Sequence, residues 1–116
     1  MSRPTAWLAA AVLLATPLAA QQTVPERTAA ERTSSHAEVL AFLDSLAHRG
    51  AAIRVGTLGE SPQGRRIPYV VAARPMVADP AEAKRSGKPV FYIQGNIHAG
   101  EVEGKEATQI LLRECV

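Results

Sequence analysis

The chain has little of several residues that would place it in common classes of protein. Cys115 is its only cysteine among 116 residues, so no disulfide can form within the chain. Five aromatic residues and no long basic run leave it without the stacking groups or positive patch that nucleic-acid binding requires. Its longest unbroken apolar stretch, Ala6 to Ala15, has ten residues and is too short to span a membrane.

That apolar stretch has the layout of a secretory signal peptide. Arg3 precedes it, Pro17 breaks it, and small residues lead to Ala20. We predict that residues 1–20 are cleaved after Ala20 and that the mature chain is secreted or periplasmic, with no stable membrane span. The alternative is an uncleaved anchor. Loss of Arg3 leaves twelve Lys and Arg against eleven Asp and Glu, so the mature chain is close to neutral and does not favour nucleic acid.

A helix is clearly marked near the start of the mature chain. Residues 21–34 are polar and alanine-rich without an apolar period, and we expect a flexible lead-in there. Ser35 and Glu38 then form a capping box, and apolar residues recur at helical spacing over residues 39–47. Gly50 ends the helix, because glycine readily adopts the left-handed conformation found after helices. The histidines at the two ends of this helix are expected in capping or solvated roles.

The middle of the chain has the patterns of a sheet. Residues 53–58 and 67–73 alternate around a turn rich in glycine and proline, which predicts an antiparallel hairpin. A short helix is expected at residues 79–82, where a second capping-box pattern includes a proline. Residues 90–94 are continuously apolar, as in a strand covered on both faces of an α/β sheet.

Residues 105–116 are predicted to form a further helix. Its expected inner face consists of Ala107, Ile110, Leu111 and Cys115. Cys115 is accordingly interpreted as a small buried side chain, the alternative being a partner beyond the end of the chain. Glu103 and Glu106 fall near the first turn, where the helix dipole favours acids. The helical pattern continues to the last residue without a stop signal, so we expect a truncated domain.

The segment between the apolar strand and this helix carries the chemistry. His98 and Glu101 follow the strand directly, and glycines at positions 95, 100 and 104 flank them. An imidazole and a carboxylate are both ligands that zinc prefers, and a loop can fold residues three apart onto one point. Ligand sites of open α/β sheets lie at the carboxyl ends of strands. We therefore predict that His98 and Glu101 bind Zn²⁺, with a third donor and a water still required.

The order of these pieces resembles the zinc carboxypeptidase family of metallopeptidases. The resemblance rests on the helix at residues 39–46, the turn at 59–67 and the glycine-rich segment at 95–104. It implies a three-layer α/β/α fold with a mixed sheet, of which residues 35–116 are the amino-terminal part. His98 and Glu101 match the family's first two zinc ligands. The family's third histidine, its glutamate base and its substrate-gripping arginine have no counterpart here, so no residue is assigned a catalytic role.

The activity that this resemblance implies is zinc-dependent hydrolysis of peptide bonds near the free C-terminus of a peptide or protein. The fragment alone is expected to be inactive and to bind zinc weakly. One alternative is a zinc amidohydrolase that deacylates N-acyl amino acids, since such proteins also use a His-x-x-Glu pair after a strand. Another is a non-catalytic, degenerate domain or binding module in which His98 and Glu101 are ordinary polar residues of a loop.

Overall fold

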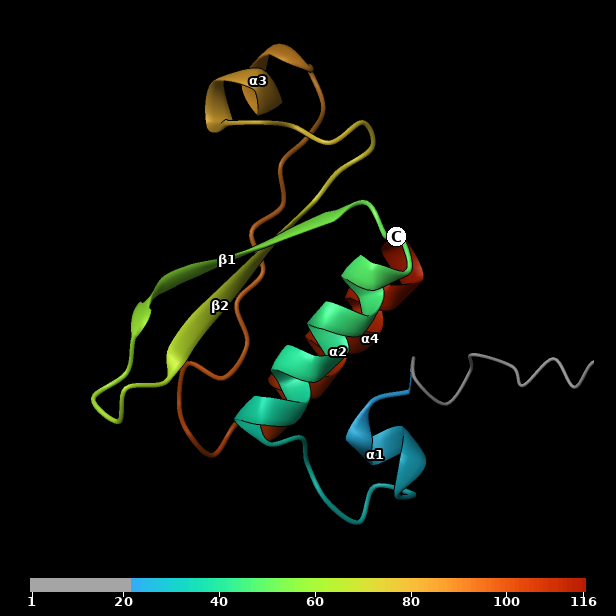
Figure 1. The fold of residues 1–116 in the computed structure, drawn as a ribbon, viewed down its shortest axis with the longest axis vertical. Coiled ribbons are helices and arrows are strands. Elements are labelled where there is room, and N and C mark those ends of the chain that lie inside the picture. Colours follow the sequence, from blue (N-terminus) through green and yellow to red (C-terminus); the bar gives the residue numbers. More distant parts are fainter. Residues whose placement is uncertain (1–21) are drawn as a thin grey trace, which may run out of the picture.

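The computed structural model describes residues 22–116 as an α/β chain of short helices and one antiparallel hairpin (Figure 1). The signal peptide predicted at residues 1–20 lies outside the described residues. The elements, in order, are α1 (Val24–Arg27), α2 (His36–His48), β1 (Ile53–Glu60), β2 (Arg66–Ala72), α3 (Pro80–Arg85) and α4 (Val102–Cys115). Helices α2 and α4 lie side by side, and α3 stands at the far end of the molecule (Figure 1). None of the helices within residues 22–116 is long and apolar enough to cross a membrane.

Helix α2 begins where the sequence predicts. The Ser35 hydroxyl accepts a hydrogen bond from the Glu38 amide at 3.3 Å, and the Glu38 carboxylate accepts one from the Ser35 amide at 2.9 Å. The Arg32 guanidinium also binds this carboxylate, so the pKa of Glu38 lies well below its usual range. Gly50 follows the helix with φ of +79°, a left-handed conformation that glycine adopts without steric cost.

The hairpin is antiparallel, as predicted. Strand β1 ends at Glu60 rather than at residue 58, and β2 spans Arg66–Ala72 rather than residues 67–73. Its pairs run from Ile53 opposite Ala72 to Glu60 opposite Arg66, with one register shift near the turn. Gly56 lies against the ring of the opposite residue, Tyr69, and a Cβ at position 56 would come within 2.4 Å of that ring. Among the described residues these two strands are the only part present of the mixed sheet that the family resemblance implies.

The core is small and centres on α2. Its buried side chains come from one face of that helix and are Phe42, Leu43 and Leu46. The partly buried residues packed against this cluster come from the same helix, the link that follows it, the hairpin and α4, and are Val39, Ala51, Ile53, Val70 and Leu112. Burial of apolar surface therefore holds the hairpin and α4 against α2.

Helix α3 confirms the short helix that was expected after the hairpin. The Asp79 carboxylate accepts a hydrogen bond from the Glu82 amide at 2.7 Å, and Pro80 occupies the first helical position. Proline fits there because the amide that it lacks would have no partner inside the helix.

The strand expected at residues 90–94 is not formed. Val90, Phe91, Tyr92 and Ile93 lie outside regular structure and are largely exposed. A strand is stabilised by hydrogen bonds to a neighbouring strand, and within residues 22–116 no strand pairs with this run. The apolar pattern marks a segment suited to burial, but pattern alone does not supply a partner.

The inner face predicted for the last helix is wrong. Of its four residues only Ile110 is half-buried; Ala107, Leu111 and Cys115 are exposed, and the buried residues of α4 are the polar Glu106 and Gln109. A helix turns by 100° per residue, so the side of α4 that meets α2 lies one step away from the predicted apolar stripe. The interpretation of Cys115 as a buried side chain is therefore wrong within this chain.

The lead-in expected at residues 21–34 is not irregular throughout. It contains α1, and three of its side chains, Thr23, Val24 and Ser34, are buried. The helix has only four residues, too few to show a period in the sequence. Its place in the fold comes from contacts with α4, far along the chain, which local patterns do not reveal.

Candidate metal centre

The loop between residues 94 and 101 leads directly into α4. Glu101 occupies the N-cap position of this helix without a capping hydrogen bond from its side chain, and its amide donates a hydrogen bond to the His98 carbonyl at 3.1 Å. Asn96 has φ of +63°, a conformation that asparagine tolerates better than most residues. The turn that these residues make brings the side chains of His98 and Glu101 to the same side of the loop.

Two glycines let the loop lie against the start of α4. A Cβ added to Gly95 would stand 2.8 Å from the carbonyl carbon and oxygen of Gly104 and 3.1 Å from the Lys105 nitrogen. A Cβ on Gly104 would in turn meet the Gly95 Cα at 3.5 Å. The close approach of the two backbones fixes the distance between the loop and the first turn of the helix.

The two side chains that the sequence singled out are in contact. The Nδ1 atom of His98 lies 2.8 Å from Oε1 of Glu101, and the His98 amide donates to Oε2 at 3.4 Å. Both side chains are open to solvent, with exposed fractions of 79% for His98 and 51% for Glu101. The spacing therefore places one imidazole nitrogen and one carboxylate oxygen together at an accessible point. Their role as metal ligands stays a prediction.

The pair suits zinc in both chemistry and separation. Tetrahedral zinc, about 2.0–2.2 Å from each donor, holds a nitrogen and an oxygen about 3.3 Å apart. The observed separation of 2.8 Å is that of a hydrogen bond, so zinc would have to replace the proton on Nδ1 and open the two atoms slightly to reach that value. Within residues 22–116 no group of three or more His, Cys, Asp or Glu side chains is arranged to hold a metal, so this pair supplies two donors.

The two other histidines are engaged elsewhere. Nε2 of His36 lies 2.7 Å from the Arg66 carbonyl, which links the start of α2 to β2. Nδ1 of His48 lies 2.7 Å from the Asp44 carbonyl one turn earlier in the same helix. Both contacts are with backbone oxygens, in keeping with the structural roles that the sequence favours.

The sequence did not predict that Glu106, near the loop, is a buried carboxylate with several hydrogen bonds. Glu106 is 8% exposed and accepts hydrogen bonds from the Thr33 hydroxyl at 2.5 Å, the Ser34 amide at 2.6 Å and the Ser34 hydroxyl at 2.8 Å. Burial raises the pKa of Glu106, but these hydrogen bonds outweigh it and the net pKa is lowered. The sequence suggested only a favourable helix dipole, because its partners lie more than seventy positions away.

A second long-range contact joins α1 to the other end of α4. The Arg113 guanidinium donates to both carboxylate oxygens of Glu26, at 2.7 and 2.9 Å. The hydrogen bonds from Arg113 lower the pKa of Glu26 from 4.5 to about 2, with a further contribution from Thr23. No local sequence signal marks this pair.

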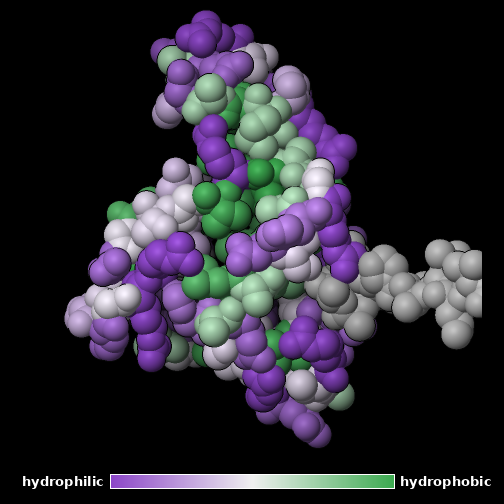
Figure 2. All heavy atoms as spheres, in the orientation of Figure 1, coloured by the Kyte–Doolittle hydropathy of each residue, from purple (hydrophilic) through white to green (hydrophobic). Residues whose placement is uncertain are grey.

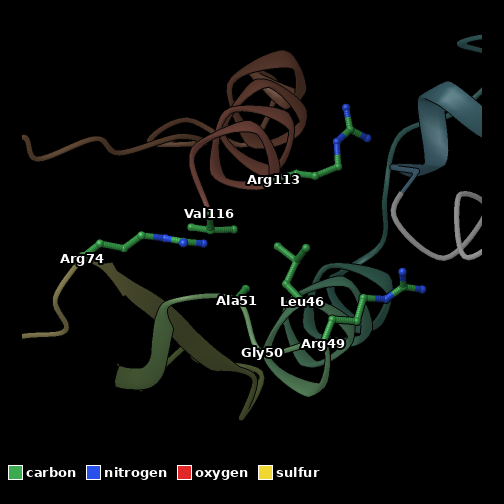
Figure 3. Close-up of a pocket in the computed structure, with 7 residues that line it drawn as sticks. All are labelled: Leu46, Arg49, Gly50, Ala51, Arg74, Arg113 and Val116. Carbon is green, nitrogen blue, oxygen red and sulfur yellow. The ribbon is translucent and has the colours of Figure 1, made fainter.

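A cavity of about 270 Å³ lies near the end of α4, away from the His98 loop. Its lining residues are Leu46, Arg49, Gly50, Ala51, Arg74, Arg113 and Val116 (Figure 3). The Arg74 side chain reaches toward Val116, whereas those of Arg49 and Arg113 extend away from the gap (Figure 3). The guanidinium groups do not converge, so this cavity is not a candidate for the site.

Taken together, an α/β chain with a His-x-x-Glu pair at the entry to a helix defines a candidate zinc centre of the metallohydrolase type. A family model described as zinc carboxypeptidase matches residues 39–116, which include both His98 and Glu101. The chain belongs to the zinc carboxypeptidase family, an α/β family of zinc-dependent hydrolases that act on peptide substrates. No curated protein and no solved structure matches the chain.

Proposed function

We propose that the protein is an exported zinc carboxypeptidase in which His98 and Glu101 contribute two ligands to the metal. Family membership supports the class of reaction. The observation that carries the assignment to these residues is the contact between His98 Nδ1 and Glu101 Oε1, which brings two zinc donors to one accessible point.

The chemistry of the pair follows from its donor atoms. His98 in its neutral form offers a nitrogen lone pair, and Glu101 offers a carboxylate whose charge offsets part of that of a divalent ion. Zinc, when bound, polarises the scissile carbonyl and lowers the pKa of a coordinated water to about 7. The protein's own task here is to hold the two side chains together, and the turn from His98 to Glu101 does so.

We propose that the active site contains further groups besides the two zinc ligands His98 and Glu101. The family resemblance implies a third histidine, a glutamate that accepts and returns the proton of the water, and an arginine that binds the terminal carboxylate of the substrate. All three occur farther along the chain in the family. We therefore expect the 116 residues alone to bind zinc weakly and to hydrolyse nothing at a useful rate.

Hydrolysis by the protein isolated from its native host tests the proposal. Peptides with a free C-terminus should be shortened from that end, whereas the same peptides with an amidated C-terminus should be cut much more slowly. A chelator should abolish the activity, and so should His98→Ala. The matched control is His48→Ala, which removes an exposed imidazole on the far end of α2.

The same assay separates the alternatives. Chelator-sensitive release of amino acids from N-acyl amino acids, with intact peptides untouched, would contradict the proposal and favour the amidohydrolase. Absence of any chelator-sensitive hydrolysis would favour a non-catalytic domain. Export is tested by amino-terminal sequencing of the secreted or periplasmic protein, for which we expect a first residue of Gln21.

A further inference from the structure

We propose that Glu106 is a positioning residue, which holds the His98–Glu101 pair in place by fastening the first turns of α4 to residues 33 and 34. The inference rests on the proposed function for its consequence in metal binding. It extends the site beyond the residues that the family model matches, because that match begins at residue 39.

The fastening uses nearly all the hydrogen-bonding capacity of one buried carboxylate. Oε1 of Glu106 accepts from the Thr33 hydroxyl and the Ser34 amide, and Oε2 accepts from the Ser34 hydroxyl. Gln109, one turn later in α4, donates to Oε2 at 3.1 Å. Hydrogen bonds to an ionised acceptor are stronger than neutral ones, and the lowered pKa of Glu106 keeps it ionised at neutral pH.

The neighbouring residue, Lys105, also binds α4 to Ser34. The Lys105 ammonium donates to the Ser34 carbonyl and lies 3.4 Å from Oε1 of Glu106. Ser34 is 3% exposed, so its amide, hydroxyl and carbonyl are all satisfied within a buried contact. Lys105 and Glu106, which are consecutive in α4, therefore both bind Ser34 in the segment that precedes α2.

Backbone contacts link the turn of α4 that binds Ser34 to the loop that carries His98 and Glu101. Gly95 lies against Gly104 and the Lys105 nitrogen, so the loop rests on the same turn of α4 that binds Ser34. Glu101 occupies the N-cap position of that helix and is covalently continuous with its first turn. His98 and Glu101 are themselves exposed, and the inter-element contacts that fix them come through this turn.

The test compares Glu106→Gln with Glu103→Gln in the full-length protein. Glu103 lies in the first turn of the same helix and is exposed. Its substitution therefore removes the same charge without removing the contacts of α4 with Thr33 and Ser34. Zinc affinity is measured by competition with a chelator, well below the melting temperature. Hydrogen exchange of the amides of residues 95–101 is measured without metal. The hairpin amides serve as the internal reference.

Glu106→Gln should weaken zinc affinity about tenfold or more, the usual effect of losing a group that orients metal ligands. It should also speed exchange in residues 95–101 relative to the hairpin. Ser34→Ala, a milder change, should shift both quantities in the same direction. Glu103→Gln should leave both unchanged.

Equal zinc affinity and equal loop exchange in Glu106→Gln and Glu103→Gln would overturn the inference, even if the melting temperature fell, since Glu106 would then only stabilise the fold. If Glu106→Gln does not fold, Ser34→Ala decides by the same criteria. If the wild-type protein binds no zinc, the proposed function fails, and the exchange measurement alone decides whether Glu106 positions the loop.

Discussion

Individual residues decide the geometry of the candidate metal centre. His98 and Glu101 meet because the chain turns between them, with the Glu101 amide bonded to the His98 carbonyl. The turn lies against the start of α4 at Gly95, where an added Cβ would come within 2.8 Å of the Gly104 backbone. The position of the loop that carries His98 and Glu101 therefore depends on a residue that has no functional group of its own.

Gly95→Ala should destabilise the protein by about 1–3 kcal/mol, because the added methyl group would overlap the backbone of Gly104 and force the loop away from α4. Urea denaturation measures the effect. The control is Gly100→Ala, where a Cβ meets nothing within 4 Å, so stability should stay the same or rise slightly. Equal stability of the two variants would contradict the tight contact between loop and helix.

Among the elements, α4 is held to the amino-terminal segment at two places. Glu106 binds residues 33 and 34 near its start, and Arg113 binds Glu26 of α1 near its end. The family match omits residues 22–38, yet these contacts make that segment part of the folded unit. The helix that carries Glu101 is thus supported by a part of the chain outside the matched region.

The Glu26–Arg113 pair gives stability that depends on pH. The folded pKa of Glu26, about 2, lies below its ordinary value of 4.5, so the pair stabilises the fold fully above about pH 5. That contribution is lost as pH falls from 5 toward 2. Glu26→Gln should therefore show a smaller loss of unfolding free energy than wild type over this range, by at most about 1 kcal/mol because the pair is partly exposed.

Urea denaturation at pH 7, 5 and 3 measures that difference. Glu31→Gln is the control, because Glu31 is an exposed carboxylate on the same segment. It should follow the wild-type curve. If Glu26→Gln and wild type lost the same free energy between pH 5 and pH 3, the pair would not contribute to stability.

Elements with local signals were predicted from the sequence, and those without were not. The capping residues Ser35 and Asp79 mark the starts of α2 and α3, and the alternating residues mark the hairpin. Contact between His98 and Glu101 was likewise accessible, since three residues of loop suffice to make it. The place of α1 and the burial of Glu106 depend on partners far along the chain, which no local pattern encodes.

On the scale of the whole molecule, apolar side chains remain at the surface. Figure 2 shows them gathered across the middle of the molecule, between α3 and the helical part. The largest continuous run consists of Val90, Phe91, Tyr92 and Ile93, with exposed fractions of 57–82%. Contiguous apolar surface with unpaired backbone groups favours association.

Phe91→Lys should reduce self-association of the isolated chain, because it places a charge in the exposed run without removing a buried contact. Sedimentation velocity at several concentrations measures the effect. Leu58→Lys is the control, a substitution at an exposed apolar residue outside the run, and should change association less. Unchanged association of Phe91→Lys would show that this run is not the surface responsible.

The metal content of the protein from its native host tests the central claim most directly. Mass spectrometry under non-denaturing conditions should find one zinc ion per molecule in wild type and in His48→Ala. His98→Ala should retain less than about a tenth of it, because a zinc site loses most of its affinity when one of its protein ligands is removed. Full zinc occupancy in His98→Ala would contradict the assignment of His98 and Glu101 as the metal-binding pair.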